Sequence, residues 1–302
     1  MSQTITTIAN EAVNRKITVP LTVKLRLNQT YAPKLTRSFQ NMTSQFQRLR
    51  NTFAAIFVIL IHATAPCASQ RKSMTTQSET IVLLHGIGKS RFDMIAMERY
   101  LKTHGYNVLN WAYPSTRYGL ETLADQLHEK LAEDPAKTYS FVTHSMGGIV
   151  VRTYLSKYQP HNVSRFVMIA PPNQGAFLAD LLCKLLPYKF WMGPAGQQLR
   201  QGQEGCCSSA GIPPCEFGII AGGTGRKIGM NPLVPGDNDV IVSVEATRLP
   251  GAKDFTVLPY PHAVIQMMPQ TCRYVNEFLR TGSFGEVQNK KRRALPVENA
   301  AP

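Results

Sequence analysis

A serine stands between small residues in the segment THSMGG at positions 143–148. The segment follows an apolar run typical of a buried strand and opens a pattern typical of a helix. A sharp turn between a strand and a helix can lift a serine hydroxyl above a sheet when its neighbours are small. The amino end of the helix also favours the negative charge that develops during attack on a carbonyl group. Ser145 is therefore the candidate nucleophile for acyl transfer.

One position of this segment departs from the usual Gly-x-Ser-x-Gly pattern. Thr143 stands where the first glycine is usual. Threonine is small enough to be plausible there, but its branched β-carbon adds crowding beside the nucleophile. The alternative interpretation is a plain strand-to-helix turn in which Gly147 and Gly148 serve only close packing.

A second short motif, HGIG at positions 85–88, directly follows the first apolar run. Acyl transfer needs two backbone N–H groups aimed at the oxyanion. We expect one from Met146, which follows the nucleophile, and the other from Ile87 in this loop. The glycines on either side of Ile87 allow the backbone to approach closely.

A serine nucleophile needs a base, and the position along the chain favours His262 among the seven histidines. It lies between a predicted strand and the last predicted helix, a location from which an imidazole can reach the serine Oγ. We expect His144 to pack beside the nucleophile and His85 to belong to the glycine loop. The others lie in an N-terminal apolar run or at expected surface positions: His62, His104, His128 and His161.

The base needs an orienting carboxylate, and the segment GDNDVIV at 236–242 offers two. Both lie between nucleophile and base, in the chain order Ser, Asp, His. Asp239 is preferred because it immediately precedes the β-branched run, and Asp237 is the alternative. Glu245 is expected to be a surface or structural residue. The Asp-x-Asp pair could also hold calcium, but no further oxygen ligands are identifiable.

These residues require elements that hold them in place, and strands alternate with helices from residue 80 onward. This order predicts the α/β class, with a mostly parallel sheet flanked by helices. The expected strands are 81–84, 106–111, 139–143, 165–170, 216–221 and 255–258, and the expected helices are 92–104, 120–131, 146–158 and 264–279.

A Gly-, Gln- and Cys-rich stretch at about 173–215 interrupts the alternation and is predicted to form a cap or lid. Its apolar pieces, 177–186 and 190–192, could contact lipid or form the core of the lid. A disulfide between Cys215 and either Cys206 or Cys207 is plausible, although spacing alone does not assign it. Paired CxxC units typical of zinc sites do not occur. We expect neither a metal nor a cofactor.

The chain has 302 residues, of which 43% are hydrophobic and 17% charged, with a net charge of +14. This composition is that of a globular protein and excludes collagen, a coiled coil and a wholly disordered chain. Much of the excess charge lies in terminal segments, including the run KKRR at 290–293. We expect no nucleic-acid partner because no nucleic-acid motif accompanies the charge.

The first 69 residues are expected to lie outside the catalytic domain. Residues 42–69 combine a basic stretch, an apolar run and a small-residue exit, as a secretory signal does. The alternative is a membrane anchor formed by residues 52–65. Because signals start a chain, we interpret residues 1–41 as a disordered or mis-called extension. The catalytic domain is expected at 70–282, and a basic flexible tail at 283–302.

Several segments resemble bacterial lipases and esterases of the α/β-hydrolase superfamily. They are IVLLHGIG, FVTHSMGGIVVR, MIAPPNQGA, GPAGQQL, NDVIVSVEATRLPGAKDF and VLPYPH, and the resemblance covers roughly residues 80–282. Such enzymes commonly show Asn-Asp-Gly before the Val-rich run. Aligning this pattern with Asn238 and Asp239 supports Asp239 as the acid, although Val240 stands where glycine is usual.

The resemblance implies an α/β-hydrolase fold and a Ser145–His262–Asp239 triad that hydrolyses carboxylic esters without a redox cofactor. The expected partner is an ester or lipid substrate, with transient contact to a membrane or lipid surface. Two other functions stay open. One is an acyltransferase with the same triad, and the other is a catalytically silent α/β-hydrolase that serves binding. The signal-like segment predicts export to the periplasm, the cell envelope or the medium.

Overall fold

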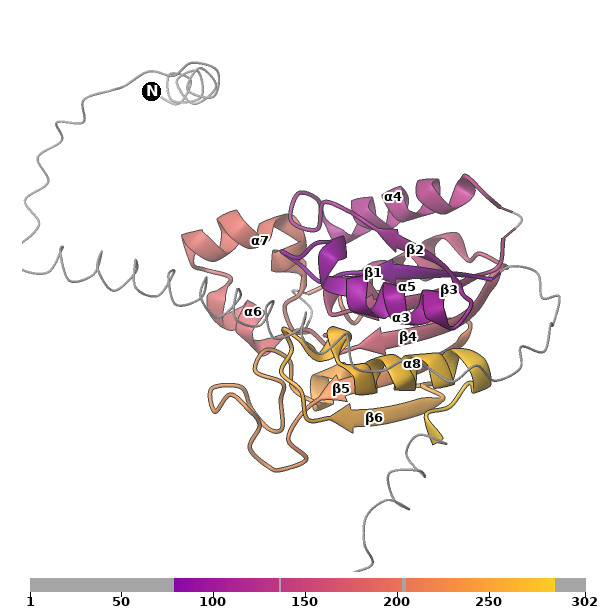
Figure 1. The fold of residues 1–302 in the computed structure, drawn as a ribbon. Coiled ribbons are helices and arrows are strands. Elements are labelled where there is room, and N and C mark those ends of the chain that lie inside the picture. The colour runs from indigo at the N-terminus through magenta and orange to yellow at the C-terminus, as the bar shows by residue number, and fades with distance from the viewer. Residues whose placement is uncertain (1–78, 136, 203–204, 286–302) are drawn as a thin grey trace, which may run out of the picture. The chain divides into compact units, whose positions relative to one another are not determined.

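Six parallel strands form one sheet in the order β2-β1-β3-β4-β5-β6 in the part of the chain that the structure describes (Figure 1). The structure is a computed structural model that describes residues 79–135, 137–202 and 205–285. The strands are β1 (Thr80–Leu84), β2 (Asn107–Trp111), β3 (Tyr139–His144), β4 (Val163–Ile169), β5 (Glu216–Gly222) and β6 (Asp254–Leu258).

The strand order reverses between β1 and β3. The chain passes from β1 outward to β2 and then crosses to β3 on the other side of β1, so that Leu84 pairs with both Trp111 and Thr143. In open parallel sheets, ligands bind outside the carboxyl ends of the strands at such a point. The HGIG loop after β1 and Ser145 after β3 both begin there.

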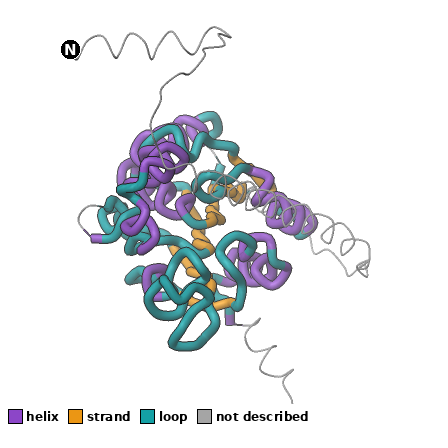
Figure 2. Tube along the Cα trace, turned by 90° about the vertical axis from the view of Figure 1, so that its left-hand side faces the viewer, coloured by secondary structure: helices purple, strands orange, loops and turns teal. Residues whose placement is uncertain are grey.

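Helices cover both faces of the sheet, as Figure 2 shows on either side of the strands. Side chains alternate between the two faces along a strand. In β1, Val82 and Leu84 belong to the core cluster on one face, and Ile81 and Leu83 to the cluster on the other. The first cluster includes α4 (Leu120–Ala132) and α5 (Met146–Tyr158), and the second includes α3 (Ile95–Thr103) and α8 (Pro269–Thr281).

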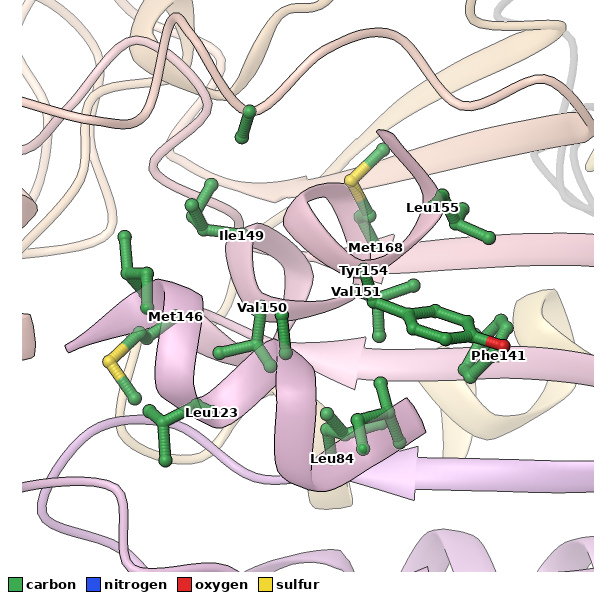
Figure 3. Packing of buried hydrophobic residues seen from close by; sticks show 14 of the residues in the cluster. Leu84, Leu123, Phe141, Met146, Ile149, Val150, Val151, Tyr154, Leu155 and Met168 are labelled. Carbon is green, nitrogen blue, oxygen red and sulfur yellow. The ribbon is translucent and has the colours of Figure 1, made fainter. Parts of the chain in front are cut away.

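Helix α5 carries the serine at its amino end and is surrounded by core. All its residues from 146 to 155 are buried. Figure 3 shows Met146, Ile149 and Val150 of this helix in the cluster that also contains Leu84 and Leu123. A helix buried on nearly all sides cannot shift without disturbing the core. The serine is therefore held on a rigid element.

All six predicted strands are present, and α5 has the predicted bounds. The last predicted helix, 264–279, is instead two elements, η4 (Ile265–Met267) and α8. Met268 between them is extended, with ψ 136°. Its conformation follows from Pro269, because a residue before proline avoids the helical region. The predicted helix 92–104 likewise begins as a 3₁₀ turn, η1 (Arg91–Met94), and continues as α3.

The predicted lid segment contains two helices, α6 (Phe177–Leu182) and α7 (Leu186–Gln198). Helix α7 is kinked at Gly193, whose φ is 59°, and Pro194 follows. A 3₁₀ turn, η3 (Glu245–Thr247), lies in the later connection between β5 and β6.

The cysteine expectation is not met. All five cysteines in the described ranges are free thiols. The Cys207 Sγ lies 3.7 Å from the Gln198 carbonyl oxygen and not in a bond with Cys215. Burial raises the pKa of the Cys207 thiol to about 12.

The first residues of the predicted tail pack against the fold. Phe284 is fully buried against Tyr274 and Phe278, and its backbone N–H donates to Asp254 Oδ2 over 2.6 Å. The glycine at position 218 leaves room for the rings of both Phe278 and Phe284, since a β-carbon there would lie 2.5 Å from the first and 2.9 Å from the second. The rest of the predicted tail, the extension 1–41 and the signal-like segment 42–69 lie outside the described residues. Among the described helices, none is long and apolar enough to cross a membrane.

Candidate active site

Ser145 occupies a strained turn between β3 and α5. Its φ of 54° and ψ of −126° lie in a region that residues other than glycine rarely adopt. Its backbone N–H donates to the Ile169 carbonyl at the end of β4 over 2.9 Å, which holds the turn. Such strain persists only where the surrounding structure enforces it, and it is common at functional sites. The predicted sharp turn at Ser145 is present.

Glycine at position 147 is required by the close approach of α5 to the end of β1. A β-carbon at Gly147 would lie 2.9 Å from the carbonyl oxygens of both Leu84 and His85. A β-carbon at Gly86 would lie 3.2 Å from the Ser145 Cβ. The HGIG loop and the serine turn are therefore in direct contact.

Thr143 fits in place of the usual glycine because of the glycine at position 148. The threonine is fully buried, and a β-carbon at Gly148 would lie 3.3 Å from its Oγ1. The Oγ1 atom has no hydrogen-bond partner within the described structure. The second glycine of the motif thus leaves the space that the branched side chain needs.

His262 joins the serine to one of the two candidate carboxylates. Its Nε2 lies 2.9 Å from Ser145 Oγ, and its Nδ1 lies 2.7 Å from Asp239 Oδ2. Asp239 is fully buried, and its Oδ1 accepts the N–H groups of Ile241 and Val242 over 3.1 and 2.7 Å. The backbone N–H of His262 also donates to the Asp239 carbonyl over 2.8 Å. The structure thus brings the three predicted side chains together in one hydrogen-bonded chain.

The alternative acid, Asp237, has different partners. Its Oδ1 accepts the N–H and the hydroxyl of Thr224 over 2.7 and 3.0 Å, and its Oδ2 accepts the Gly225 N–H over 2.8 Å. It therefore closes the turn after β5. Glu245 is exposed and accepts from Arg248 Nε over 3.0 Å within its own loop, as expected of a structural residue.

His144 positions the loop that carries the base, a role that the sequence did not reveal. Its Nε2 lies 3.0 Å from the His262 carbonyl oxygen, which can only accept a hydrogen bond. Burial, together with the neighbouring His262, holds the pKa of His144 well below its ordinary value. The ring is therefore neutral at pH 7 and carries its proton on Nε2.

The HGIG loop is fixed by residues that follow β2. The Tyr113 hydroxyl donates to the His85 carbonyl over 2.5 Å, and its ring stacks on the His85 ring with centroids 4.3 Å apart. Ser115 Oγ accepts the Gly88 N–H over 3.1 Å. Within the described structure, the backbone N–H groups of Ile87 and Met146 make no hydrogen bond. Both predicted donors are therefore unpaired in the described structure.

Comparisons with known proteins fit this architecture. The family model of palmitoyl protein thioesterase matches residues 80–203. The mature lipase BlEst2 of Bacillus licheniformis has 20% sequence identity and a TM-score of 0.55, with 71% of this chain and 96% of that chain covered. The phospholipase PlaB of Legionella pneumophila has 17% identity and a TM-score of 0.55, with 72% of this chain and 64% of that chain covered.

These matches and the parallel sheet decide the architecture. The chain has the α/β-hydrolase fold. The predicted fold class is therefore confirmed, together with the resemblance to bacterial lipases and esterases of this superfamily.

The chain is strained at the position where it departs from the Asn-Asp-Gly pattern. Val240 has a φ of 92°, in the region that favours glycine. Its N–H donates to Asn238 Oδ1 over 3.0 Å, and its carbonyl accepts from Asn231 Nδ2 over 3.0 Å. These contacts hold the turn that aims the next two N–H groups at Asp239. The usual glycine thus reflects a backbone requirement that Val240 meets at a cost.

Replacing Val240 by Gly is expected to raise the free energy of unfolding by about 1 kcal/mol. Relief of about 1–3 kcal/mol of backbone strain outweighs the 0.5–1 kcal/mol by which glycine favours the unfolded chain. Chemical denaturation measures the change. The matched control is Val244→Gly, where φ is −52° and no strain is relieved. Equal destabilisation by both changes would contradict this account.

Replacing Tyr113 by Phe is expected to lower kcat about tenfold and to leave KM within twofold. Phe keeps the ring but lacks the hydroxyl that fixes the His85 carbonyl, and the loss of one positioning hydrogen bond is worth about 1.4 kcal/mol. Steady-state kinetics on a soluble ester measure the effect. Tyr139→Phe is the control, because that hydroxyl also donates to backbone carbonyls but lies at the opposite end of β3. A rise in KM with an unchanged kcat would show that Tyr113 acts on substrate binding.

Helix α7 of the predicted lid packs against the HGIG loop. A β-carbon at Gly196 in α7 would lie 3.3 Å from the Ile87 Cδ1. The Gln198 side chain accepts the Leu120 N–H over 2.7 Å and ties the end of α7 to α4.

The candidate site is largely shielded from solvent, since Ser145 and His262 are each only 7% exposed. Within the described ranges, no group of three or more His, Cys, Asp or Glu side chains could hold a metal ion.

Proposed function

We propose that this α/β-hydrolase cleaves carboxylic esters through a serine nucleophile and an acyl-enzyme. One observation carries the proposal. The His262 imidazole lies 2.9 Å from Ser145 Oγ on one side and 2.7 Å from Asp239 Oδ2 on the other. A nucleophile, a base and a carboxylate that orients the base are the parts that this chemistry needs.

The proposed reaction has two halves. Ser145 Oγ attacks the ester carbonyl carbon while His262 Nε2 takes the serine proton, and the N–H groups of Ile87 and Met146 bind the oxyanion. The tetrahedral intermediate collapses, the C–O bond to the alcohol breaks, and His262 gives its proton to the leaving oxygen. Water then attacks the acyl-enzyme with His262 again as base, and the carboxylic acid leaves. Asp239 fixes the tautomer of the imidazole and stabilises its cationic form.

We propose lipid esters as the substrate class. The family match names a palmitoyl thioesterase, and two similar structures are a lipase and a phospholipase. An acyl chain bound to oxygen and one bound to sulfur both present the carbonyl carbon that Ser145 would attack. We also propose export, which rests on the signal-like residues 42–69; amino-terminal sequencing of protein recovered from the cell envelope or medium tests it.

The testing experiment follows hydrolysis of p-nitrophenyl butyrate, p-nitrophenyl palmitate and a palmitoyl thioester by the purified chain. We expect turnover, a burst of one p-nitrophenol per chain and an acyl mass on the peptide that contains Ser145. Product analysis with added alcohol distinguishes hydrolysis from acyl transfer. A folded protein that neither turns over nor becomes acylated would contradict the proposal and favour a silent binding protein.

A further inference from the structure

Large apolar side chains are exposed mainly at one edge of the molecule. Eleven are exposed in the described structure, and all lie in connections between strands; of these eleven, only Ile212 lies within five residues of the amino end of the next strand. Ser145 and His262 lie at the same edge. In Figure 1, α6, α7 and the long connection between β5 and β6 all lie on this side of the sheet. Contiguous exposed apolar surface marks an interaction site.

The lid carries the largest part of this surface. Phe190 is 86% exposed, Trp191 67% and Leu186 79%. Lys184 and Lys189 are exposed beside them. Residues 181–202 include no acidic residue. The tip of the lid therefore combines aromatic and aliphatic side chains with positive charge alone.

The same combination recurs in three other connections at this edge. After β1, the exposed Phe92 is next to Arg91, whose guanidinium carbon lies 5.3 Å from the centre of its ring. After β2 the exposed pair is Arg117–Tyr118, and after β5 it is the segment 226–228, Arg-Lys-Ile. Four independent connections thus each place a base beside an exposed apolar side chain.

Four acidic residues of these connections are engaged inside the fold. Asp93 bonds with Lys89, Asp180 with Arg200, and the side chains of Asp237 and Asp239 with backbone N–H groups. None of the four is exposed. The exposed acids of these connections, among the described residues, are Glu121, Glu129 and Glu133 on or beside α4 and Glu245, which pairs with Arg248. The six exposed bases that lie beside apolar side chains in these connections therefore outnumber the four exposed acids.

We infer that this edge is a docking surface for an anionic phospholipid bilayer. Tryptophan and phenylalanine enter the boundary between headgroups and acyl chains, while lysine and arginine stems lie along apolar surface with their charges at anionic headgroups. Nucleic acid would match the charge but not the exposed leucines. The inference deepens the proposed function, since docking at this edge would present lipid esters to Ser145.

The two tryptophans of the chain allow a site-specific test. Trp111 lies half-buried in β2, and its ring stacks on Tyr113. Trp111→Phe keeps an aromatic ring there and leaves Trp191 as the reporter. The full chain with this change is mixed with vesicles of phosphatidylcholine alone or with 30% phosphatidylglycerol. We expect a blue shift of Trp191 emission and quenching by doxyl lipids with the anionic vesicles, both reversed by high salt.

Two matched double substitutions distinguish binding by this edge from general attraction due to the net charge of +14. Lys184→Gln with Lys189→Gln is expected to weaken vesicle affinity about 30-fold, about fivefold for each lysine. Lys130→Gln with Lys137→Gln removes the same charge at the opposite edge and is expected to change affinity less than twofold. Equal losses in both pairs would overturn the inference. Trp191 emission that does not shift with anionic vesicles would also overturn it. The same holds if a high concentration of the protein alone, or DNA, causes an equal shift.

A soluble short-chain ester keeps the two proposals distinguishable. Both double variants are expected to hydrolyse this ester at the wild-type rate, because the substituted lysines lie outside the proposed catalytic hydrogen-bond chain. Failure of Trp191 to enter the bilayer, with normal turnover, would overturn only the docking surface. Vesicle entry without turnover would overturn only the serine mechanism.

Discussion

Ser145→Ala is expected to lower kcat for a soluble ester by about 10⁴–10⁶-fold while the fold is retained. Alanine has no oxygen to form the acyl-enzyme, so only water held near His262 could attack. Residual rate enhancement would come from the oxyanion N–H groups and from substrate binding. Initial rates together with intact-protein mass spectrometry measure turnover and acylation in the same sample.

The control for this change is Ser140→Ala. Ser140 lies in the same strand, β3, and its Oγ accepts the Arg165 N–H over 2.9 Å, away from the carboxyl edge. It is fully buried. We expect this variant to lose some stability and to keep turnover within threefold. Retained turnover in Ser145→Ala at more than a hundredth of the wild-type rate would show that another group attacks the ester.

Asp239→Asn is expected to lower kcat about 10⁴-fold with little change in fold. The Oδ1 of Asp239 accepts two backbone N–H groups, so an asparagine would keep its oxygen there and turn its NH₂ group toward His262. An NH₂ donor facing Nδ1 favours the tautomer with the proton on Nε2. That tautomer cannot accept the proton of Ser145, which lies 2.9 Å away.

Asp237→Asn distinguishes the two acids. Its carboxylate accepts from Thr224 and Gly225 and does not contact the base. We expect kcat within threefold of wild type and a lower free energy of unfolding, because the turn after β5 loses charge-assisted hydrogen bonds. Measuring kcat and denaturation for both variants decides the assignment. A larger kcat loss in Asp237→Asn would make Asp237 the orienting acid.

The buried strands and α5 were predictable because their signals are local. Ile81–Leu84 is a continuous apolar run, as strands covered on both faces are. The THSMGG segment carries the requirements of its own turn, including Gly147 against β1. Chain order then limited the base and the acid to a few residues.

Other features were not predictable because they depend on contacts between distant segments. Asp237 and Asp239 are two residues apart, and only the turn at Thr224 separates their roles. A lone Phe284 in a polar segment gives no periodic signal, although it fills the space left by Gly218. The hydrogen bond from Tyr113 to the HGIG loop joins residues that are 28 positions apart, and no sequence motif marks it.

The separation of the serine from its base, 117 residues in sequence, orders events during synthesis. The serine turn and the HGIG loop leave the ribosome first. At about 5–20 residues per second, the base follows roughly 6–25 s later, and the buried Phe284 later still. A nascent chain therefore holds an unactivated hydroxyl until the base has been synthesised. If the chain attacks lipid esters, as proposed, it would in this way stay inert toward the membranes of the cell that makes it until β6 has joined the sheet and α8 has packed against it.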